Sequence, residues 1–177
     1  TKIGMGWPER VDIIKWINLI LSWEPNARIV LHGVSMGAAT VLMASGEDLP
    51  ENVKAVIADC GYTSEWDEFR READALHIPW FPVLNATSVL SKIRDGYDFK
   101  QASALAQVKK SHIPTLFIHG SSDELVPYSM LGELYAAAAC EKEELTVEGA
   151  GHALSSSVAP TLYWHTVEDF IAKYLDR

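Results

Sequence analysis

Short strand-like runs and longer stretches with helical spacing follow one another along the chain. The strand-like runs cover residues 27–32, 53–58, 115–119 and 144–148, and the first three are apolar without a regular polar alternation. Such runs are typical of parallel strands that helices cover on both faces. The pattern therefore predicts an α/β fold with a parallel sheet of about four strands, helices on both faces and right-handed crossovers.

The helical stretches predict which faces are buried. In the first, over residues 8–22, Val11, Ile14, Ile17 and Leu21 recur with helical spacing, with Ile13 and Ile20 beside them, and predict one buried face. The other regular helices are predicted over residues 38–44, 83–94, 101–109, 128–140 and 161–175, and the last of these places Val167, Phe170, Ile171 and Tyr174 on one face.

Charge and composition narrow the classes of partner. Fifteen Lys and Arg residues against 24 Asp and Glu residues give a formal net charge of −9. Neither a nucleic acid nor an anionic membrane is therefore an expected partner. No apolar run approaches the roughly 18 residues of a membrane-spanning helix, so no membrane contact is expected. Thr1 is not an initiator methionine, and the sequence assigns no compartment.

The sequence contains no motif for a metal or a phosphate group. Cys60 and Cys140 form neither a disulfide framework nor a metal motif with nearby histidines, so both are predicted to pack in the interior. No pair of histidines or carboxylates has convincing metal-ligand spacing, and no glycine-rich phosphate loop is present. No metal site is therefore predicted.

One serine lies between two glycines at the end of a predicted strand. Residues 33–37 have the order Gly-Val-Ser-Met-Gly and lead from the strand into a helix of small residues. So tight a turn forces Ser35 into a strained backbone conformation and exposes its hydroxyl, and Gly33 and Gly37 are predicted to let strand and helix pack closely. Ser35 is the candidate nucleophile. The alternative is a glycine-flanked serine in an ordinary turn, and the rest of the chain decides between them.

Two further residues complete a candidate catalytic set. Ser35, Asp123 and His152 each follow a different predicted strand, and the carboxyl ends of parallel strands meet at one edge of a sheet. A serine hydroxyl needs a base to take its proton, and the base needs a carboxylate that fixes its tautomer. His152 is the predicted base and Asp123 the predicted orienting acid. Asp59 also follows a strand and is the alternative acid.

The segment over residues 64–111 is the least regular and is rich in aromatic residues. Ser64, with Asp67 three residues later, has the spacing of a capping box and predicts a helix start. We interpret the segment as a small helical cap over the strand ends, with Trp66, Trp80 and Phe81 as predicted substrate-binding residues. The alternative is a helical crossover with its own small core.

These motifs together resemble the C-terminal half of an α/β-hydrolase fold serine hydrolase. The resemblance rests on residues 33–37, 117–127 and 149–152 and covers essentially the whole chain. Residues 58–64 and the short aromatic segment further resemble bacterial esterase and peptidase members close to the serine aminopeptidase and BEM46-like groups. The resemblance implies hydrolysis of esters, amides or peptides through an acyl-enzyme, without a metal or an organic cofactor.

The chain departs from that family in its extent. The family sheet has about eight strands, and this chain supplies the last four, so residues 1–177 are expected to form one partial domain. The missing N-terminal half is then its expected partner, beside the strand over residues 27–32, whose edge would otherwise stay unpaired. The backbone N–H of Met36 is one predicted donor to the oxyanion, and the second donor is expected in that missing half.

Three functions are compatible with the sequence. The first is a serine hydrolase that cleaves a small-molecule carboxylic ester with an apolar acyl group through an acyl-enzyme intermediate. The second is an amidase or peptidase that uses the same three residues on an amide or peptide substrate. The third, from another class, is a non-catalytic binding domain on the same fold. The presence of both Ser35 and His152 argues against this function.

Overall fold

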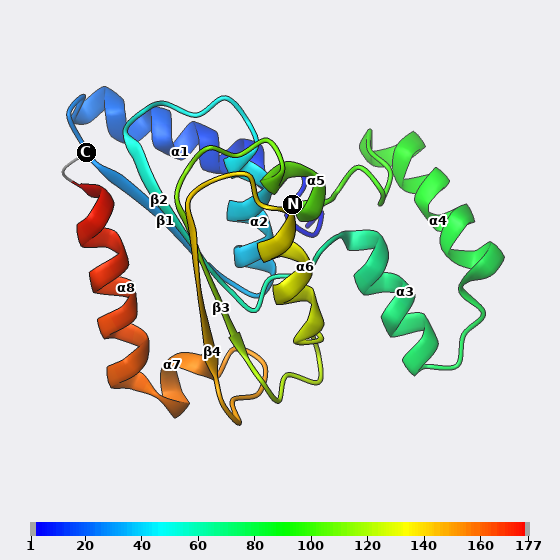
Figure 1. Cartoon of the computed structure of the whole chain (residues 1–177). Helices are drawn as coiled ribbons and strands as arrows, with labels where there is room; N and C mark the ends of the chain where they lie inside the picture. The colour runs from blue at the N-terminus through cyan, green and yellow to red at the C-terminus, as the bar shows by residue number, and fades with distance from the viewer. Residues whose placement is uncertain (1–2, 176–177) are drawn as a thin grey trace.

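One parallel sheet of four strands organises the computed structural model, which describes residues 3–175 (Figure 1). The strands lie in the order in which they occur along the chain, so that β2 and β3 are central and β1 and β4 are the edges. The predicted α/β fold is confirmed. The strands are β1 (Ile29–Val34), β2 (Val53–Asp59), β3 (Thr115–Gly120) and β4 (Lys142–Val147).

The register brings the carboxyl ends of all four strands to one edge of the sheet. Val34 pairs with Asp59, Asp59 with Ile118, and Gly120 with Val147. The segments that leave the strands therefore begin side by side, as expected for consecutive parallel strands. This alignment brings together residues that are far apart in the sequence.

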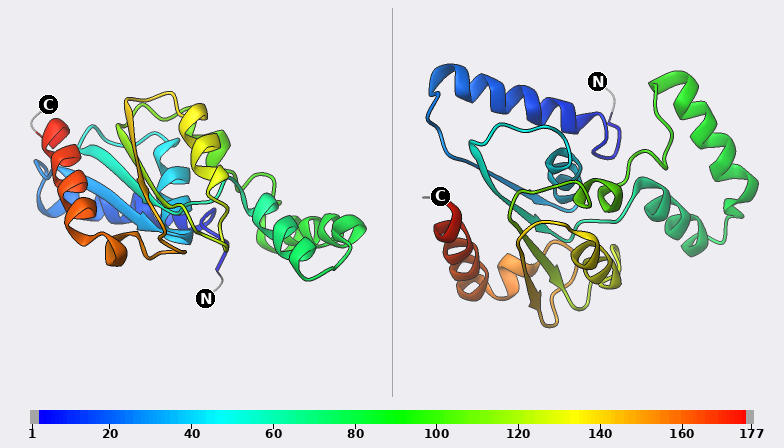
Figure 2. Two further views of the ribbon diagram at one scale, coloured as in Figure 1. Left: turned by 60° about the horizontal axis from the view of Figure 1, so that its bottom comes forward. Right: turned by 45° about the horizontal axis from the view of Figure 1, so that its top comes forward.

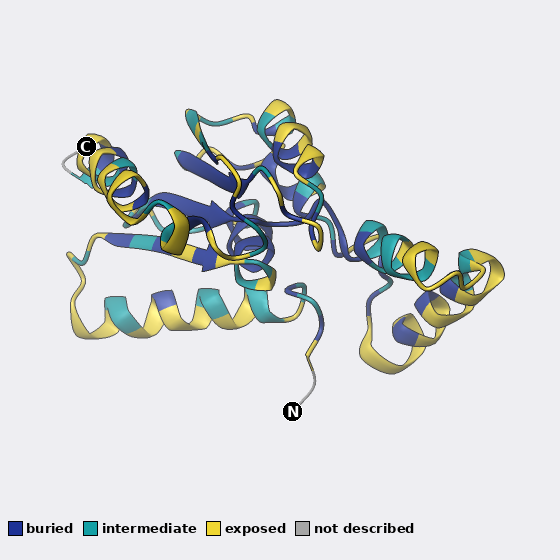
Figure 3. Ribbon diagram, turned by 90° about the horizontal axis from the view of Figure 1, so that it is seen from below, coloured by how far each residue is buried: buried dark blue, intermediate teal, exposed yellow. Residues whose placement is uncertain are grey.

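Helices cover both faces of the sheet, and α1 and α8 lie on opposite sides of it (Figure 3). The predicted helix at residues 101–109 is shorter in the structure, and the one predicted at 83–94 is longer. None of the helices within residues 3–175 is both long and apolar enough to cross a bilayer. The helices are α1 (Glu9–Trp23), α2 (Met36–Ser45), α3 (Glu65–Ala75), α4 (Trp80–Asp95), α5 (Ala104–Val108), α6 (Ser129–Ala137), α7 (Ser155–Val158) and α8 (Pro160–Leu175).

Two apolar cores, one on each face, hold these layers together. The larger core includes α2, whose residues 38–45 are all buried, together with side chains of α1, α5 and α6. The smaller core packs α8 against the opposite face of the sheet through Tyr163, Val167, Phe170 and Tyr174. Burial of such large side chains supplies the main driving force for both contacts.

The buried face of α1 agrees with the prediction except at Val11. Val11 is 42% exposed, and Ile17 is the residue of α1 that is fully buried. Ile13, Ile20 and Leu21 pack partly against the same core. Val11 therefore lies outside the face that α1 buries.

The segment between β2 and β3 leaves the sheet as a pair of helices. Figures 1 and 2 show α3 and α4 packed on each other and extending away from the sheet in every view. The Ser64 hydroxyl accepts the backbone N–H of Asp67 at 3.0 Å, which confirms the predicted cap of α3. An antiparallel bridge between Ser64 and Ser103 closes the base of the segment. Its role as a cap over a site stays a prediction.

The strand β1 lies at an edge of the sheet. Among the described strands it pairs with β2, and its outward residue Val34 is 42% exposed. An apolar edge of this kind favours pairing with a further strand. The expected strand beside β1, from a longer polypeptide, stays a prediction.

The two glycines of the serine turn have different roles. A Cβ atom on Gly33 would lie 2.2 Å from the carbonyl oxygen of Gly37, so β1 and α2 approach each other too closely for a side chain. A Cβ atom on Gly37 would have no described atom within 4 Å beyond its own helix and chain neighbours. The prediction that both glycines permit close packing is therefore correct for Gly33 and wrong for Gly37.

This difference predicts opposite effects of two matched substitutions. Gly33→Ala should lower the free energy of unfolding by about 1–3 kcal/mol or more, because backbone atoms must move to admit the methyl group. Gly37→Ala should leave it unchanged or raise it by up to about 1 kcal/mol, because alanine favours the helix. Urea unfolding of both variants measures the difference, and equal destabilisation would contradict this account of the turn.

Candidate active site

Ser35 occupies the strained turn between β1 and α2. Its backbone has φ 56° and ψ −120°, a conformation that residues other than glycine rarely adopt. The Ser35 N–H donates to the carbonyl oxygen of Asp59 at 2.8 Å, which ties the turn to the end of β2. Ser35 precedes α2 but does not cap it with its side chain. Its hydroxyl is therefore available for another partner.

That partner is His152. The Oγ atom of Ser35 lies 2.7 Å from Nε2 of His152, and Nδ1 of His152 lies 2.8 Å from Oδ2 of Asp123. The His152 side chain is 20% exposed, whereas the Asp123 side chain is fully buried. The structure thus brings the three predicted residues into one chain of hydrogen bonds. Their catalytic roles stay a prediction.

The Asp123 carboxylate is fully surrounded by donors. Its Oδ1 accepts the backbone N–H groups of Leu125 and Val126, each at 2.9 Å. Oδ2 accepts from His152 and lies 3.2 Å from Nε2 of His119, which is also 3.0 Å from the carbonyl oxygen of Val126. A buried carboxylate needs such partners, and they fix the direction in which it faces His152.

Asp59, the alternative acid, contacts residues that follow His152 in the chain. Its Oδ1 accepts the hydroxyl of Ser155 at 3.2 Å, and Tyr163 also hydrogen-bonds to it. Burial raises the pKa of Asp59, and these hydrogen bonds oppose the rise. Tyr163 in turn contacts Nε2 of His32 at 3.0 Å. Asp59 therefore anchors the segment that follows His152. Sequence reasoning missed Ser155 and Tyr163, which belong to no motif.

Three residues other than glycine adopt left-handed backbone conformations around the site. Ser35, Cys60 and Ala153 have φ values of 56°, 50° and 57°. Each such residue costs roughly 1–3 kcal/mol and persists only where the surrounding structure imposes it. Burial raises the pKa of the Cys60 thiol to about 12, so this thiol is neutral near pH 7. The strain is concentrated where β1, β2 and the His152 loop meet.

The surroundings of Ser35 combine a helix start with apolar side chains. Met36 is the first residue of α2, and the first N–H groups of a helix have no acceptor within it. Val34, Met36, Leu125 and Leu154 flank the three site residues in the chain and are 42%, 36%, 46% and 49% exposed. The start of a helix favours negative charge near its first N–H groups.

The three aromatic residues assigned to substrate binding lie on the projecting helices. The ring of Trp66 lies 4.5 Å from the Lys100 ammonium, and Arg70 lies 4.8 Å from the ring of Trp80. Phe81 is 66% exposed. Because α4 begins at the outer end of the pair (Figure 1), the structure does not bring Trp80 or Phe81 together with Ser35. Their assignment to substrate binding stays a prediction.

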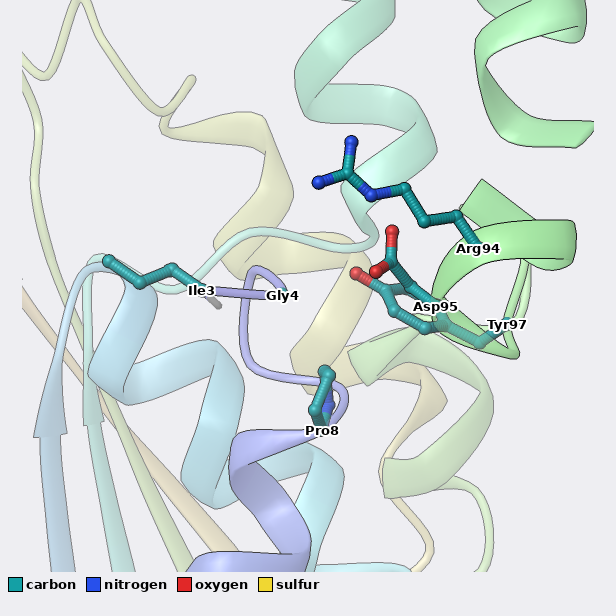
Figure 4. Close-up of a pocket in the computed structure, with 6 residues that line it drawn as sticks. All are labelled: Ile3, Gly4, Pro8, Arg94, Asp95 and Tyr97. Carbon is teal, nitrogen blue, oxygen red and sulfur yellow. The ribbon is translucent and has the colours of Figure 1, made fainter. Parts of the chain in front are cut away.

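Two adjoining cavities lie between the N-terminal loop and the end of α4. Their volumes are about 460 Å³ and 360 Å³, and both are lined by Ile3, Arg94, Asp95 and Tyr97. In Figure 4 the side chains of Arg94, Asp95 and Tyr97 reach toward the loop at Gly4. Sequence patterns do not reveal these cavities, because their walls come from separate elements.

Glu65 lines the smaller cavity from the start of α3. It is 2% exposed, and its Oε2 atom has no hydrogen-bond partner among the described residues. Burial raises the pKa of Glu65 from an ordinary 4.5 to about 8, although a hydrogen bond from Tyr97 opposes the rise. Glu65 is therefore mostly protonated at pH 7.

Comparisons with known proteins agree with this architecture. A model of the prolyl oligopeptidase family matches residues 9–177. The uncharacterised protein YqkD of Bacillus subtilis is 31% identical over 170 residues, which cover 94% of this chain and 55% of that protein. The alpha/beta hydrolase domain-containing protein WAV2 of Arabidopsis thaliana is 30% identical over 182 residues, which cover 96% of this chain and 56% of that protein. The chain thus spans about half the length of these relatives.

Solved structures share the fold. The acylaminoacyl peptidase of Pyrococcus horikoshii superposes with a TM-score of 0.71 at 18% identity, over 98% of this chain and 29% of that one. The esterase Pf2001 of Pyrococcus furiosus superposes with a TM-score of 0.72 at 19% identity, over 99% of this chain and 65% of that one. These matches confirm the predicted fold, and a fold alone does not fix a substrate.

The buried Glu65 predicts a specific dependence of stability on pH. The folded state keeps the Glu65 proton up to about pH 8, whereas the unfolded state loses it near pH 4.5, so this residue lowers stability progressively as pH rises through that window. Urea unfolding gives the difference in the free energy of unfolding between Glu65→Gln and the wild type. This difference should favour the variant more strongly at pH 9 than at pH 5. Glu133→Gln, at an exposed position of α6, is the control. An equal difference at both pH values would contradict the prediction.

Proposed function

Since the chain belongs to the prolyl oligopeptidase family, we propose that it carries the catalytic residues of a serine hydrolase that cleaves carboxylic esters. The observation that carries the proposal is the unbroken hydrogen-bond chain from Ser35 through His152 to Asp123, with distances of 2.7 Å and 2.8 Å. Geometry of this kind lets an imidazole activate a hydroxyl that is otherwise a weak nucleophile.

The first half of the reaction forms an acyl-enzyme. Oγ of Ser35 attacks the carbonyl carbon of the ester while Nε2 of His152 takes the hydroxyl proton. Asp123 holds the Nδ1–H of His152 and stabilises the imidazolium that results. The backbone N–H of Met36 donates to the oxyanion of the tetrahedral intermediate. When that intermediate collapses, the carbon–oxygen bond to the leaving group breaks and His152 gives its proton to the departing alcohol.

The second half releases the acid. Water attacks the acyl carbonyl as His152 takes one of its protons, and the collapse returns that proton to Ser35. The exposed apolar residues Val34, Met36 and Leu154 support an apolar acyl group as the preferred substrate. Neither half of the reaction uses a metal ion or an organic cofactor.

An amidase or peptidase is the second candidate. The prolyl oligopeptidase description of the family and the acylaminoacyl peptidase among the structural neighbours support it. The same three residues serve both reactions, so only the surroundings of the leaving group discriminate. A non-catalytic binding domain is less well supported, because such a domain would gain nothing from the Ser35–His152 contact.

Covalent labelling tests the nucleophile. A fluorophosphonate probe should label the purified protein. Ser35→Ala should abolish the labelling and should lower kcat for esters by about 10⁴-fold. Ser157→Ala, at an exposed serine of α7, is the matched control and should be labelled like the wild type. Labelling that persists in Ser35→Ala would remove Ser35 from the mechanism.

A substrate panel tests the reaction class. The kcat/KM for p-nitrophenyl butyrate should exceed that for p-nitrophenyl acetate by about tenfold, because each buried methylene of the acyl chain contributes about 0.8 kcal/mol. Aminoacyl p-nitroanilides, which have an amine leaving group, should be cleaved more slowly than either ester. A higher kcat/KM on the anilides would replace the esterase assignment with the peptidase.

A further inference from the structure

Cys60 lies next to the proposed catalytic residues, although the reaction does not use it. Three possible metal-ligand atoms lie within 4.8 Å of one another: the sulfur of Cys60, a carboxylate oxygen of Asp123 and a ring nitrogen of His152. The three residues follow β2, β3 and β4, so their proximity comes from the alignment of the strand ends. Their wide separation in the sequence explains why spacing gave no sign of a cluster.

The sulfur of Cys60 lies in the interior of the site, beside strained backbone. The side chain is fully buried, and burial and the Asp59 carboxylate raise the pKa of its thiol, whereas the backbone N–H groups of Ala153 and Ser35 oppose that rise. These two residues and Cys60 itself are the strained positions of the site, with φ values between 50° and 57°. A bound metal ion itself deprotonates a coordinating thiol, so a neutral thiol in the free protein is compatible with a metal-bound thiolate.

We propose that Cys60, Asp123 and His152 bind a thiophilic divalent transition-metal ion, with Zn²⁺ as the representative, and that the bound ion switches the hydrolase off. Thiolate, imidazole and carboxylate are the ligand types that Zn²⁺ prefers, and water or the Ser35 hydroxyl fills a fourth, tetrahedral position. Ligand atoms around tetrahedral zinc lie about 3.3–3.8 Å apart, a spacing that falls within the 4.8 Å limit on the distances between the three ligand atoms. Ca²⁺ and Mg²⁺ prefer oxygen ligands and are disfavoured.

The chemistry of inhibition follows from the imidazole. A neutral imidazole has a single nitrogen lone pair. When the ion takes that lone pair, His152 has none left to accept the proton of Ser35. Formation of the metal–sulfur bond releases the thiol proton to solvent, and the thiolate and carboxylate balance the two charges of the ion. The inhibitory part of the proposal rests on the proposed function, whereas the binding part does not.

Cobalt binding tests the site without any enzymatic assay. Co²⁺ added to the purified wild-type protein should produce a thiolate-to-cobalt charge-transfer absorption in the near ultraviolet. The band should persist in Cys140→Ala, the matched control at the other cysteine, and disappear in Cys60→Ala and Cys60→Ser. Absence of the band in the wild type at saturating Co²⁺ would overturn the proposal irrespective of how the variants fold. Its persistence in both Cys60 variants would do the same.

Inhibition then tests the switch. Zn²⁺ should inhibit hydrolysis of p-nitrophenyl butyrate by the wild type and by Cys140→Ala, whereas Mg²⁺ should not. Loss of one ligand should raise the inhibitory Zn²⁺ concentration by about tenfold or more in Cys60→Ser. Equal inhibition of Cys60→Ser and wild type would overturn the switch. If the protein cleaves no ester, the cobalt experiment still decides the metal site, so failure of the two proposals can be told apart.

Discussion

The close approach of β1 and α2 at Gly33 is the constraint on which the site depends. Because a Cβ atom would collide with the Gly37 carbonyl, the chain can turn from strand to helix only with a bare backbone at this position. The sharp turn forces Ser35 to a positive φ and turns its hydroxyl away from its own helix toward His152. The strain is maintained by the buried helix α2 and by the hydrogen bond from Ser35 to the end of β2.

The parallel architecture was predictable because it rests on local patterns. Apolar runs with intervening helical periodicity indicate a buried parallel sheet, and such a sheet aligns its strand ends. That alignment is sufficient to bring Ser35, Asp123 and His152 together from motifs scattered over the chain. The cap at Ser64 was predictable for the same reason, since its hydrogen bond spans three residues.

Features that depend on how individual side chains and helices pack, and not on the alignment of strand ends, could not be predicted. The contact from Asp59 to Ser155 joins two elements with no shared motif, and the exposed position of Val11 follows from how α1 happens to meet the core. Gly37 fits the motif as well as Gly33 does, yet only the three-dimensional path of the helix decides which glycine is crowded. The direction in which α3 and α4 project likewise depends on packing between them. Hydrophobic periodicity describes one helix or strand at a time, so it does not predict contacts between separate elements.

The hydrogen bond between Ser35 and His152 also has a kinetic meaning, because it joins residues 117 positions apart in the sequence. Parallel strands cannot pair through tight hairpins, so every neighbour in this sheet is reached by closing a long crossover, which makes folding slow. The contact needs β1 and β4 both in place, at opposite edges of the sheet. The contact can therefore form only once both edge strands have joined the sheet, so it reports assembly of the whole sheet and not of one element.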